Sequence, residues 1–228
     1  MIIDDTTALE TTGEPATDAS DSPSLITHVG VFLFASGLFT LIARGVATRT
    51  AQRIDEPARD FMQEHRSEGL DVAVKPVTAL SLPLLVASST AALAYWLKRN
   101  DRPAAALATI VTPLVAAAVG QSFTTFLAQR NPPDAQDSPD GEVTEPSFPS
   151  GHTTGVTAEA FAIGYILARE DLLTPAIATA LAAWPLLVGV TRVYRDRHWT
   201  SDVLGGYSAG TAVAAAMAML YELRRSRS

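Results

Sequence analysis

The stretch that decides the fold and the site runs from residue 191 to residue 210 and reads TRVYRDRHWTSDVLGGYSAG. Its one histidine, His198, follows Arg192 by six positions and precedes Asp202 by four. On a helix, side chains at positions i and i+4 lie on the same face, so this imidazole and this carboxylate can meet. The stretch leads directly into an apolar run, residues 203–220. We therefore expect a polar site at the end of a hydrophobic helix.

A second polar cluster lies about forty residues earlier, where Ser150, Gly151 and His152 follow a proline and precede another apolar run. A helix that begins here offers backbone N–H groups to an anion. Gly151 allows a bound group to approach the backbone closely, and His152 can transfer a proton near neutral pH. The same residues are also compatible with a simple helix cap followed by an incidental histidine. Together, the two clusters indicate a phosphate-handling site at a membrane surface.

Long apolar runs predict the architecture. A helix of about 20 apolar residues spans a bilayer core, and shorter runs reach that length when flanking motif residues extend them. Proline, glycine, alanine, serine and threonine within the runs are tolerated in membrane helices and allow close packing. We therefore predict an all-α integral membrane bundle of about six transmembrane helices. Their approximate limits are residues 25–43, 77–97, 104–127, 153–168, 174–190 and 203–220.

The remaining segments are polar. Residues 1–24 are acidic and almost free of bulky apolar side chains, which predicts a disordered acidic tail ahead of one domain, residues 25–228. Residues 44–72 mix charges of both signs and predict an interfacial or extramembrane helical connection, which could help cover the site although nothing in the segment requires it. The chain has no cysteine, which excludes disulfides and thiolate metal sites. Its net charge of −7 argues against a nucleic-acid partner.

Basic residues in short loops predict the orientation. Lys98, Arg99 and Arg102 place one loop in the cytoplasm, together with the arginine-rich C-terminus. The loop 131–150 contains aspartate and glutamate but no lysine or arginine, and it should lie outside. The arginines within 44–66 then fall on the outer side, against the trend. Both histidine clusters share one face in either orientation, and we predict the outer face of the cell membrane.

The chemistry of the 191–210 stretch follows from its residue types. A carboxylate that holds one imidazole nitrogen fixes the tautomer and leaves the other nitrogen of His198 free as a nucleophile. The planar guanidinium of Arg192 matches phosphoryl oxygens. Asp202 stands just before an apolar run, so it could instead cap the last helix, or do both.

These motifs resemble a known family. Ser150-Gly151-His152 after a proline, and Arg192-x5-His198-x3-Asp202 followed by DVLGGYSAG, are similar to the second and third signature motifs of the type 2 phosphatidic acid phosphatase superfamily. That superfamily also includes bacterial acid phosphatases and vanadium haloperoxidases. The resemblance covers roughly residues 75–220, and its specific part is confined to 130–206.

The resemblance implies a role for each motif residue. The catalytic residues would be His198, which attacks phosphorus to form a phosphohistidine, Asp202, which orients it, and His152, which protonates the leaving oxygen and later activates water. The phosphate-binding residues would be Arg130, Ser150, Gly151 and Arg192. The implied reaction needs no metal and no cofactor, because these groups supply the positive electrostatic environment. Its substrate would be a lipid phosphate or diphosphate ester held in the bilayer.

The first signature motif departs from the family pattern. The family has a lysine, six residues and then Arg-Pro, whereas residues 124–133 read TTFLAQRNPP and supply no lysine in any register. Thr191 also replaces the usual serine before Arg192. Three hypotheses follow: a lipid phosphatase, a catalytically weak or non-enzymatic membrane protein of the same fold, and a vanadate-dependent haloperoxidase. The sequence does not identify the lipid or the oligomeric state.

Overall fold

The computed structural model describes residues 25–126, 130–135 and 146–226. Within these ranges the regular secondary structure is entirely helical, as predicted. The tail 1–24 and the acidic part of the loop, 136–145, lie outside the described residues. The helices are α1 (Leu25–Ala47), α2 (Gln52–Glu64), α3 (Glu68–Leu80), α4 (Pro83–Arg99), α5 (Pro103–Phe126), η2 (Pro133–Ala135), α6 (Gly151–Arg169), α7 (Pro175–Tyr194) and α8 (Thr200–Arg225).

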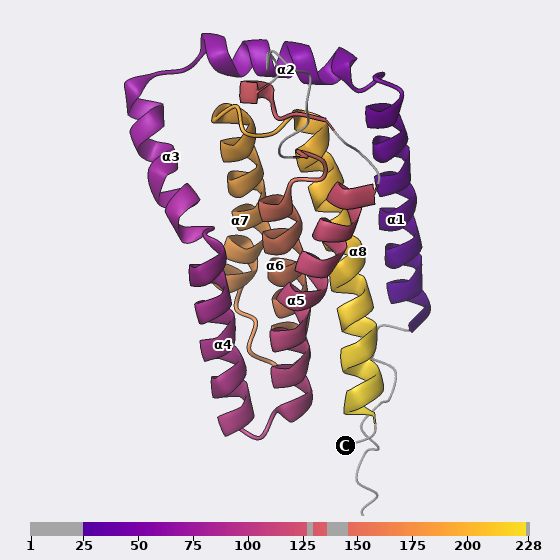
Figure 1. Ribbon diagram of the computed structural model, residues 1–228. Coiled ribbons are helices and arrows are strands. Elements are labelled where there is room, and N and C mark those ends of the chain that lie inside the picture. The colour runs from indigo at the N-terminus through magenta and orange to yellow at the C-terminus, as the bar shows by residue number, and fades with distance from the viewer. Residues whose placement is uncertain (1–24, 127–129, 136–145, 227–228) are drawn as a thin grey trace, which may run out of the picture.

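The long helices run up and down beside one another (Figure 1). Helix α8 lies in the middle and packs most extensively against α6 and α1, while α5 contacts both α6 and α8. Helix α7 covers α6 on another side, and α4 reaches the bundle through α5. The α4–α5 turn and the C-terminus of α8 lie at one end, which we call the far end. The residues around 146–151 and 195–199 lie at the opposite end, the site end.

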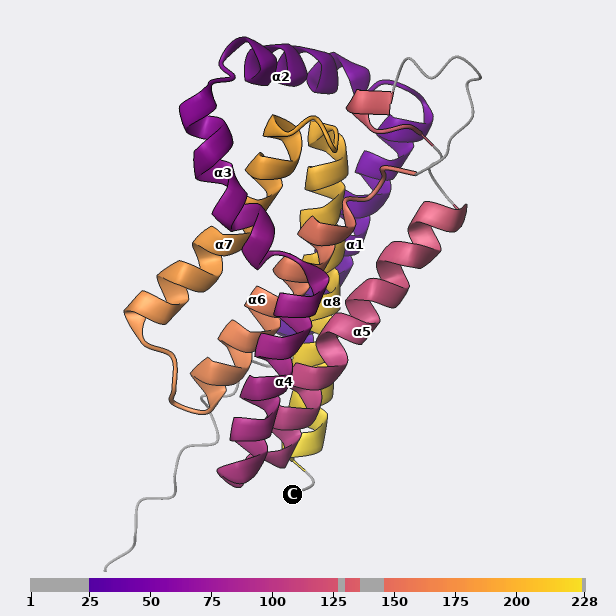
Figure 2. The ribbon, with the colours of Figure 1, turned by 60° about the vertical axis from the view of Figure 1, so that its left-hand side comes forward.

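The segment between the first two predicted spans forms two helices. Helix α2 crosses the site end almost at right angles to the bundle, and α3 descends beside α7 (Figures 1 and 2). The continuous span predicted over 77–97 is wrong, because α3 ends at Leu80 and α4 begins at Pro83 with a bend of 48°. A proline in the first turn of a helix needs no N–H partner, and so it favours a new helix start at this position.

Four of the described helices, α1, α5, α7 and α8, are long and apolar enough to cross a membrane, and the bent pair α3–α4 counts as a fifth. Helix α6 is not among them, because its sequence includes several threonines and Glu159. The neighbouring helices bury these polar side chains. On α1 the large apolar side chains Leu33, Phe34 and Leu41 are exposed at the surface of the bundle. Such a surface fits lipid, whereas α6 needs its protein neighbours.

Small residues explain why α8 approaches α6 so closely. A Cβ on Gly206 would lie 2.9 Å from Thr153 Cβ, and one on Gly210 would lie 2.7 Å from the carbonyl oxygen of Thr154. A Cβ on Gly205 would meet the ring of Phe148 at 2.6 Å. The glycines of the LGGYSAG stretch therefore let the two backbones touch, as small residues do in membrane bundles. This contact places the N-termini of α6 and α8 side by side.

Candidate active site

Four predicted side chains converge at the site end from different elements. His152 stands in the first turn of α6, Arg192 in the last turn of α7, His198 in the loop after α7, and Asp202 in the first turn of α8. The charges of Arg192 and His198 both act on the imidazole of His152. The backbone N–H of Ser150 donates to the carbonyl oxygen of Asp202 at 3.0 Å, which joins the two motifs directly.

The orientation of His198 is set by one hydrogen bond and one nearby carboxylate. Its Nδ1 lies 3.0 Å from the carbonyl oxygen of Ser147 and 3.6 Å from Oδ2 of Asp202. A carbonyl oxygen can only accept a hydrogen bond, so Nδ1 carries the proton and donates it. Nε2 of the neutral ring then keeps its lone pair. The sequence assigned this task to Asp202 alone, and the structure adds the Ser147 carbonyl.

Asp202 is buried and uses both carboxylate oxygens. Oδ2 accepts from the backbone N–H of Trp199 at 2.9 Å, which caps α8. Oδ1 accepts from Nη2 of Arg130 at 2.5 Å and from its Nε at 3.1 Å. The capping role that the sequence allowed is therefore present, and the same carboxylate lies close to His198. A buried carboxylate with several charge-assisted donors is held rigidly in its ionised form.

Arg192 is buried without a full set of partners. Its side chain belongs to the buried residues, yet Nε and Nη2 have no hydrogen-bond partner among the described residues. Leaving a buried charged donor unpaired costs more free energy than the hydrogen bond itself contributes to stability. An anion that accepted both N–H groups would remove this cost. The structure thus contains a fork-shaped cationic donor beside two histidines.

The start of α6 supplies further donors. Ser150 is fully buried, and its hydroxyl accepts from Oγ1 of Thr153 at 3.0 Å while keeping its own proton to donate. Its backbone N–H is already engaged with Asp202. The first N–H groups of a helix, here from Gly151 onward, have no partner within the helix. A side chain added at Gly151 would meet nothing within 4 Å, so the space in front of this helix end is open.

Arg130 is placed differently from the other predicted phosphate ligands. Its Nη1 donates to Oδ2 of Asp55 at 2.9 Å, and its Nη2 donates to Oγ of Ser201 at 2.6 Å as well as to Asp202. Its guanidinium also lies 5.4 Å from the ring centre of Trp199. Most of its donors are thus directed at carboxylates of the protein. The predicted contact of Arg130 with phosphate stays a prediction.

Sequence reasoning missed three contributors to this site: Asp55, Ser147 and Ser201. Asp55 lies in a helix of mixed charges, where nothing in the local pattern distinguishes it from its neighbours. Ser147 contributes only its backbone carbonyl, which no side-chain pattern reveals. Ser201 lies between motif residues, so its position could have drawn attention.

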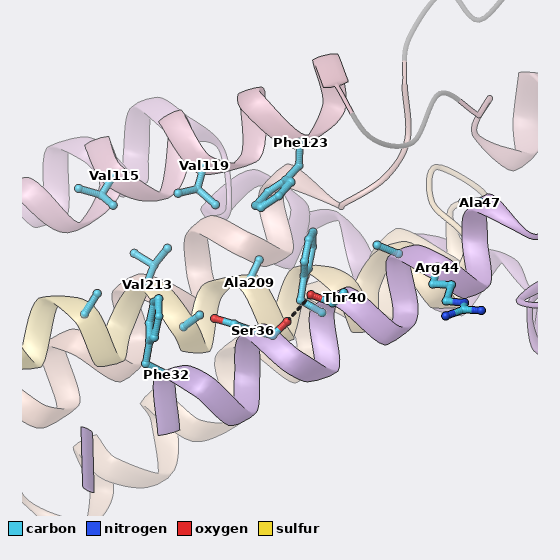
Figure 3. A pocket seen from close by; sticks show the side chains of 14 residues that line it. Phe32, Ser36, Thr40, Arg44, Ala47, Val115, Val119, Phe123, Ala209 and Val213 are labelled. Carbon is cyan, nitrogen blue, oxygen red and sulfur yellow. Dashed lines mark hydrogen bonds between the residues drawn. The ribbon is translucent and has the colours of Figure 1, made fainter. Parts of the chain in front are cut away.

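Two apolar cavities lie near these residues. A cavity of about 360 Å³ begins at Gly151 and His152 and runs between α4 and α5, with Val86, Pro113 and Ala116 on its walls. A larger groove of about 600 Å³ lies between α1, α5 and α8, and none of the predicted catalytic or phosphate-binding residues lines it (Figure 3). Among the described residues, no three His, Cys, Asp or Glu side chains are arranged to hold a metal ion. Of these two cavities, the smaller one joins an apolar path to His152.

These features define a class: a helical membrane bundle whose histidine, arginine and aspartate side chains converge at one end. Residues 105–226, more than half of the chain, match the PAP2 superfamily. The chain therefore belongs to the PAP2 superfamily, and the resemblance of its motifs is confirmed.

Two similar proteins are both bacterial. Phosphatidylglycerophosphatase B of Bacillus subtilis (strain 168) is 37% identical over 71 residues, which are 28% of this chain and 34% of that protein. The crystal structure of a transmembrane PAP2-type phosphatidylglycerolphosphate phosphatase from Bacillus subtilis has a TM-score of 0.67 and 21% identity. It covers 88% of this chain and 96% of that one. The chain matches only about a third of the first relative, whereas the second confirms the all-α membrane fold.

Proposed function

We propose that this protein hydrolyses a lipid phosphate monoester or diphosphate at the membrane surface, without a metal, through a phosphohistidine. The observation that carries this proposal is the buried, incompletely partnered guanidinium of Arg192 beside His152 and His198. A phosphoryl group offers acceptors in the geometry of a guanidinium fork. Membership of the PAP2 superfamily supports the same conclusion.

The first half of the reaction uses both histidines. The phosphoryl oxygens accept hydrogen bonds from Arg192, the Ser150 hydroxyl and the N–H groups at the start of α6. Nε2 of His198 attacks phosphorus, and the bond between phosphorus and the lipid oxygen breaks. The negative charge of the bound phosphoryl group favours the protonated form of His152, which gives its proton to that oxygen as it leaves. The resulting phosphohistidine keeps its Nδ1 proton, directed at the Ser147 carbonyl and Asp202.

The second half releases phosphate. His152, now unprotonated, accepts a proton from a water molecule whose oxygen attacks phosphorus. The bond from phosphorus to Nε2 of His198 breaks, and inorganic phosphate leaves with the site restored. Asp202 stabilises the positive charge that develops on the His198 ring in both halves. Asp202 is buried and hydrogen-bonded at the start of α8. Its carboxylate is therefore already in place before the reaction, and no free energy is spent on reorienting it.

The substrate's apolar part has a path into the membrane. The cavity that begins at His152 opens between α4 and α5 and is lined mainly by small and apolar side chains. A lipid tail there would leave its headgroup at Arg192 and the start of α6. Among such lipids we propose phosphatidylglycerol phosphate as the first candidate, because the similar Bacillus subtilis enzyme and the similar crystal structure are both described as phosphatases of this lipid.

Phosphate release by the purified protein tests the activity. The protein in detergent, with EDTA present, should release phosphate from one or more of phosphatidylglycerol phosphate, phosphatidic acid, diacylglycerol diphosphate and a polyprenyl diphosphate. His198→Ala should abolish release, whereas His65→Ala, at an exposed histidine of the described chain, should not. A radiolabel from the substrate should be trapped on the wild-type protein in an acid-labile form. No release from a folded protein would favour the non-enzymatic hypothesis, and activation by vanadate would favour a haloperoxidase.

We also propose that the site faces outward at the cell membrane. The far end carries Lys98, Arg99 and Arg102, and the last turn of α8 carries Arg224 and Arg225. Since the chain has no cysteine, single cysteines can report sidedness. In intact cells, an impermeant maleimide should label Asp60→Cys on α2 and leave a cysteine at Arg224 unlabelled. The opposite pattern would place the site inside.

A further inference from the structure

One carboxylate on α2 is buried although the rest of that helix is not. Asp55 is 1% exposed and is the buried residue of α2, whose neighbouring position, Glu56, is exposed. Burying an ionised carboxylate costs several kcal/mol unless charged and hydrogen-bonding partners offset that cost. The contacts of Asp55 should therefore show what it does.

Among the described residues, the hydrogen bonds of the Asp55 carboxylate go to the start of α8 and to Arg130. Oδ1 accepts from the backbone N–H of Ser201 at 2.7 Å, and Oδ2 accepts from its hydroxyl at 2.7 Å. Oδ2 also accepts from Nη1 of Arg130 at 2.9 Å. Ser201 precedes Asp202, so Asp55 holds the helix turn that carries the carboxylate beside His198. It caps α8 from a different helix.

The charges of this cluster explain why a second carboxylate is needed. Arg130 binds Asp202 directly, at 2.5 Å, and by itself would neutralise the carboxylate that faces His198. Asp55 lies on the same guanidinium at 2.9 Å and offsets that positive charge. The two carboxylates and one guanidinium leave one net negative charge next to the imidazole. A negative environment stabilises the positive ring that forms when His198 attacks phosphorus.

We propose that Asp55 is a positioning residue for the reaction: acting through Arg130 and Ser201, it fixes Asp202 and preserves the negative charge beside His198. This inference rests on the proposed function. Asp55 has no direct contact with His152, Arg192 or His198 among the described hydrogen bonds, so it should affect turnover more than substrate binding. Through Asp55, helix α2, which lies across the site end, would take part in catalysis (Figure 1).

A purely structural attachment of α2 is the competing explanation. Helix α2 has a second attachment, in which Nε and Nη2 of Arg59 donate to Asp196, both at 2.7 Å. This pair should keep α2 on the bundle when the carboxylate of Asp55 is removed. A merely structural Asp55 would change thermal stability without changing how the remaining activity depends on pH.

The experiment compares Asp55→Asn with Glu56→Gln. Each variant removes one carboxylate from α2 with little change of shape, but only Asp55 is buried against Arg130. For Asp55→Asn we expect kcat to fall by about tenfold or more with KM changed less than about twofold, and Glu56→Gln to match the wild type. Asp55→Glu, which restores the charge, should recover part of kcat. Equal kcat in Asp55→Asn and wild type would overturn the inference.

The pH profile separates positioning from stability. The charged and titratable groups around His198 are His152, Arg192, Asp202 and Arg130, with Asp55 behind them and with Arg195 and Arg197 of the same loop acting on Arg192. Removing the charge of Asp55 makes protonation of this cluster less favourable, so the acid limb of kcat/KM should move to lower pH. An unmoved acid limb with a lower melting temperature would show a structural role and overturn the inference.

A double variant keeps the test decisive if Asp55→Asn does not fold. Arg130→Gln with Asp55→Asn removes a buried carboxylate together with its guanidinium partner and leaves Asp202 charged. Its kcat should lie within about threefold of that of Arg130→Gln alone, because only the contact of Asp55 with Ser201 is left to lose. A further loss of more than about threefold would contradict the inference. The proposed function fails separately: then the wild type itself would release no phosphate, or His198→Ala would stay active.

Discussion

Clusters of charged side chains lie at both ends of the α6–α8 pair, but the two clusters differ in how many of their side chains have partners within the protein. At the far end, Arg169 binds Glu222 at 2.8 Å and Arg102 binds Glu170 at 3.0 Å. The hydroxyl of Tyr221 also donates to Glu170. At the site end, Asp55 and Asp202 take up Arg130, while Arg192 keeps two donors unpartnered among the described residues. The far end is a closed network, whereas the site end leaves donors of Arg192 available for the phosphoryl group that we propose binds there.

This difference shows how one kind of interaction serves two purposes. A paired, partly buried ion network holds helix ends together and costs free energy when one member is removed. An unpaired buried cation costs free energy in the empty protein and repays it on binding an anion. We therefore expect substitutions at the far end to change stability, and those at the site end to change activity.

The largest expected effect is the loss of the proposed nucleophile. His198→Ala should lower phosphate release at least about 1,000-fold, since removing a residue that forms the covalent intermediate abolishes that route. The melting temperature should change little, because the side chain is near the surface of the site. Release rates and thermal unfolding in detergent check both statements. A variant that retained release would show that another group attacks phosphorus.

The substitution Arg192→Met should show most clearly that the site end affects activity whereas the far end affects stability. Phosphate release should fall by about 100-fold or more, because the main cationic ligand is lost. The melting temperature should stay the same or rise, because an unpartnered buried charge is removed. Arg169→Met at the far end should do the reverse, lowering the melting temperature while activity at low temperature stays within about twofold of wild type. Destabilisation by Arg192→Met would mean that this guanidinium has a structural partner.

A substitution midway along the α6–α8 pair tests how closely these two helices pack. Gly210→Ala would put a Cβ 2.7 Å from the Thr154 carbonyl and 3.0 Å from the Ala158 nitrogen. Overpacking of this kind costs about 1–3 kcal/mol, so the melting temperature should fall. Gly155→Ala on α6, where a Cβ meets nothing within 4 Å, is the matched control. Equal melting temperatures for the two variants would contradict the close contact of α6 and α8.

The smallest expected effect lies within the far-end network. Tyr221→Phe removes one donor to Glu170 but leaves Arg102 in place. The cost should be about 1 kcal/mol, with phosphate release unchanged. Thermal unfolding and release assays measure the two quantities. A loss of activity here would mean that the far end communicates with the site, and the division between the ends would no longer hold.

Much of the fold could be predicted from the sequence. The apolar runs predicted an all-α membrane bundle, because only helices satisfy every backbone group inside a bilayer without closing a barrel. The wrong prediction of one continuous span over 77–97 lies at Ser81 and Leu82, where Pro83 favours a new helix start although a membrane helix can also tolerate a proline. The motifs predicted which side chains converge, since their spacing and flanking spans place them at one end.

By itself the sequence determined the helices, the family and the four converging motif residues, because periodicity, length and motif spacing are local properties of the chain. Only the tertiary structure decided that Ser147 orients His198, that Arg130 binds two carboxylates, and that Asp55 reaches the start of α8. Asp55 and Ser201 are separated by 146 positions. A contact over that distance depends on how α2 crosses the bundle, and no local pattern of residues encodes it.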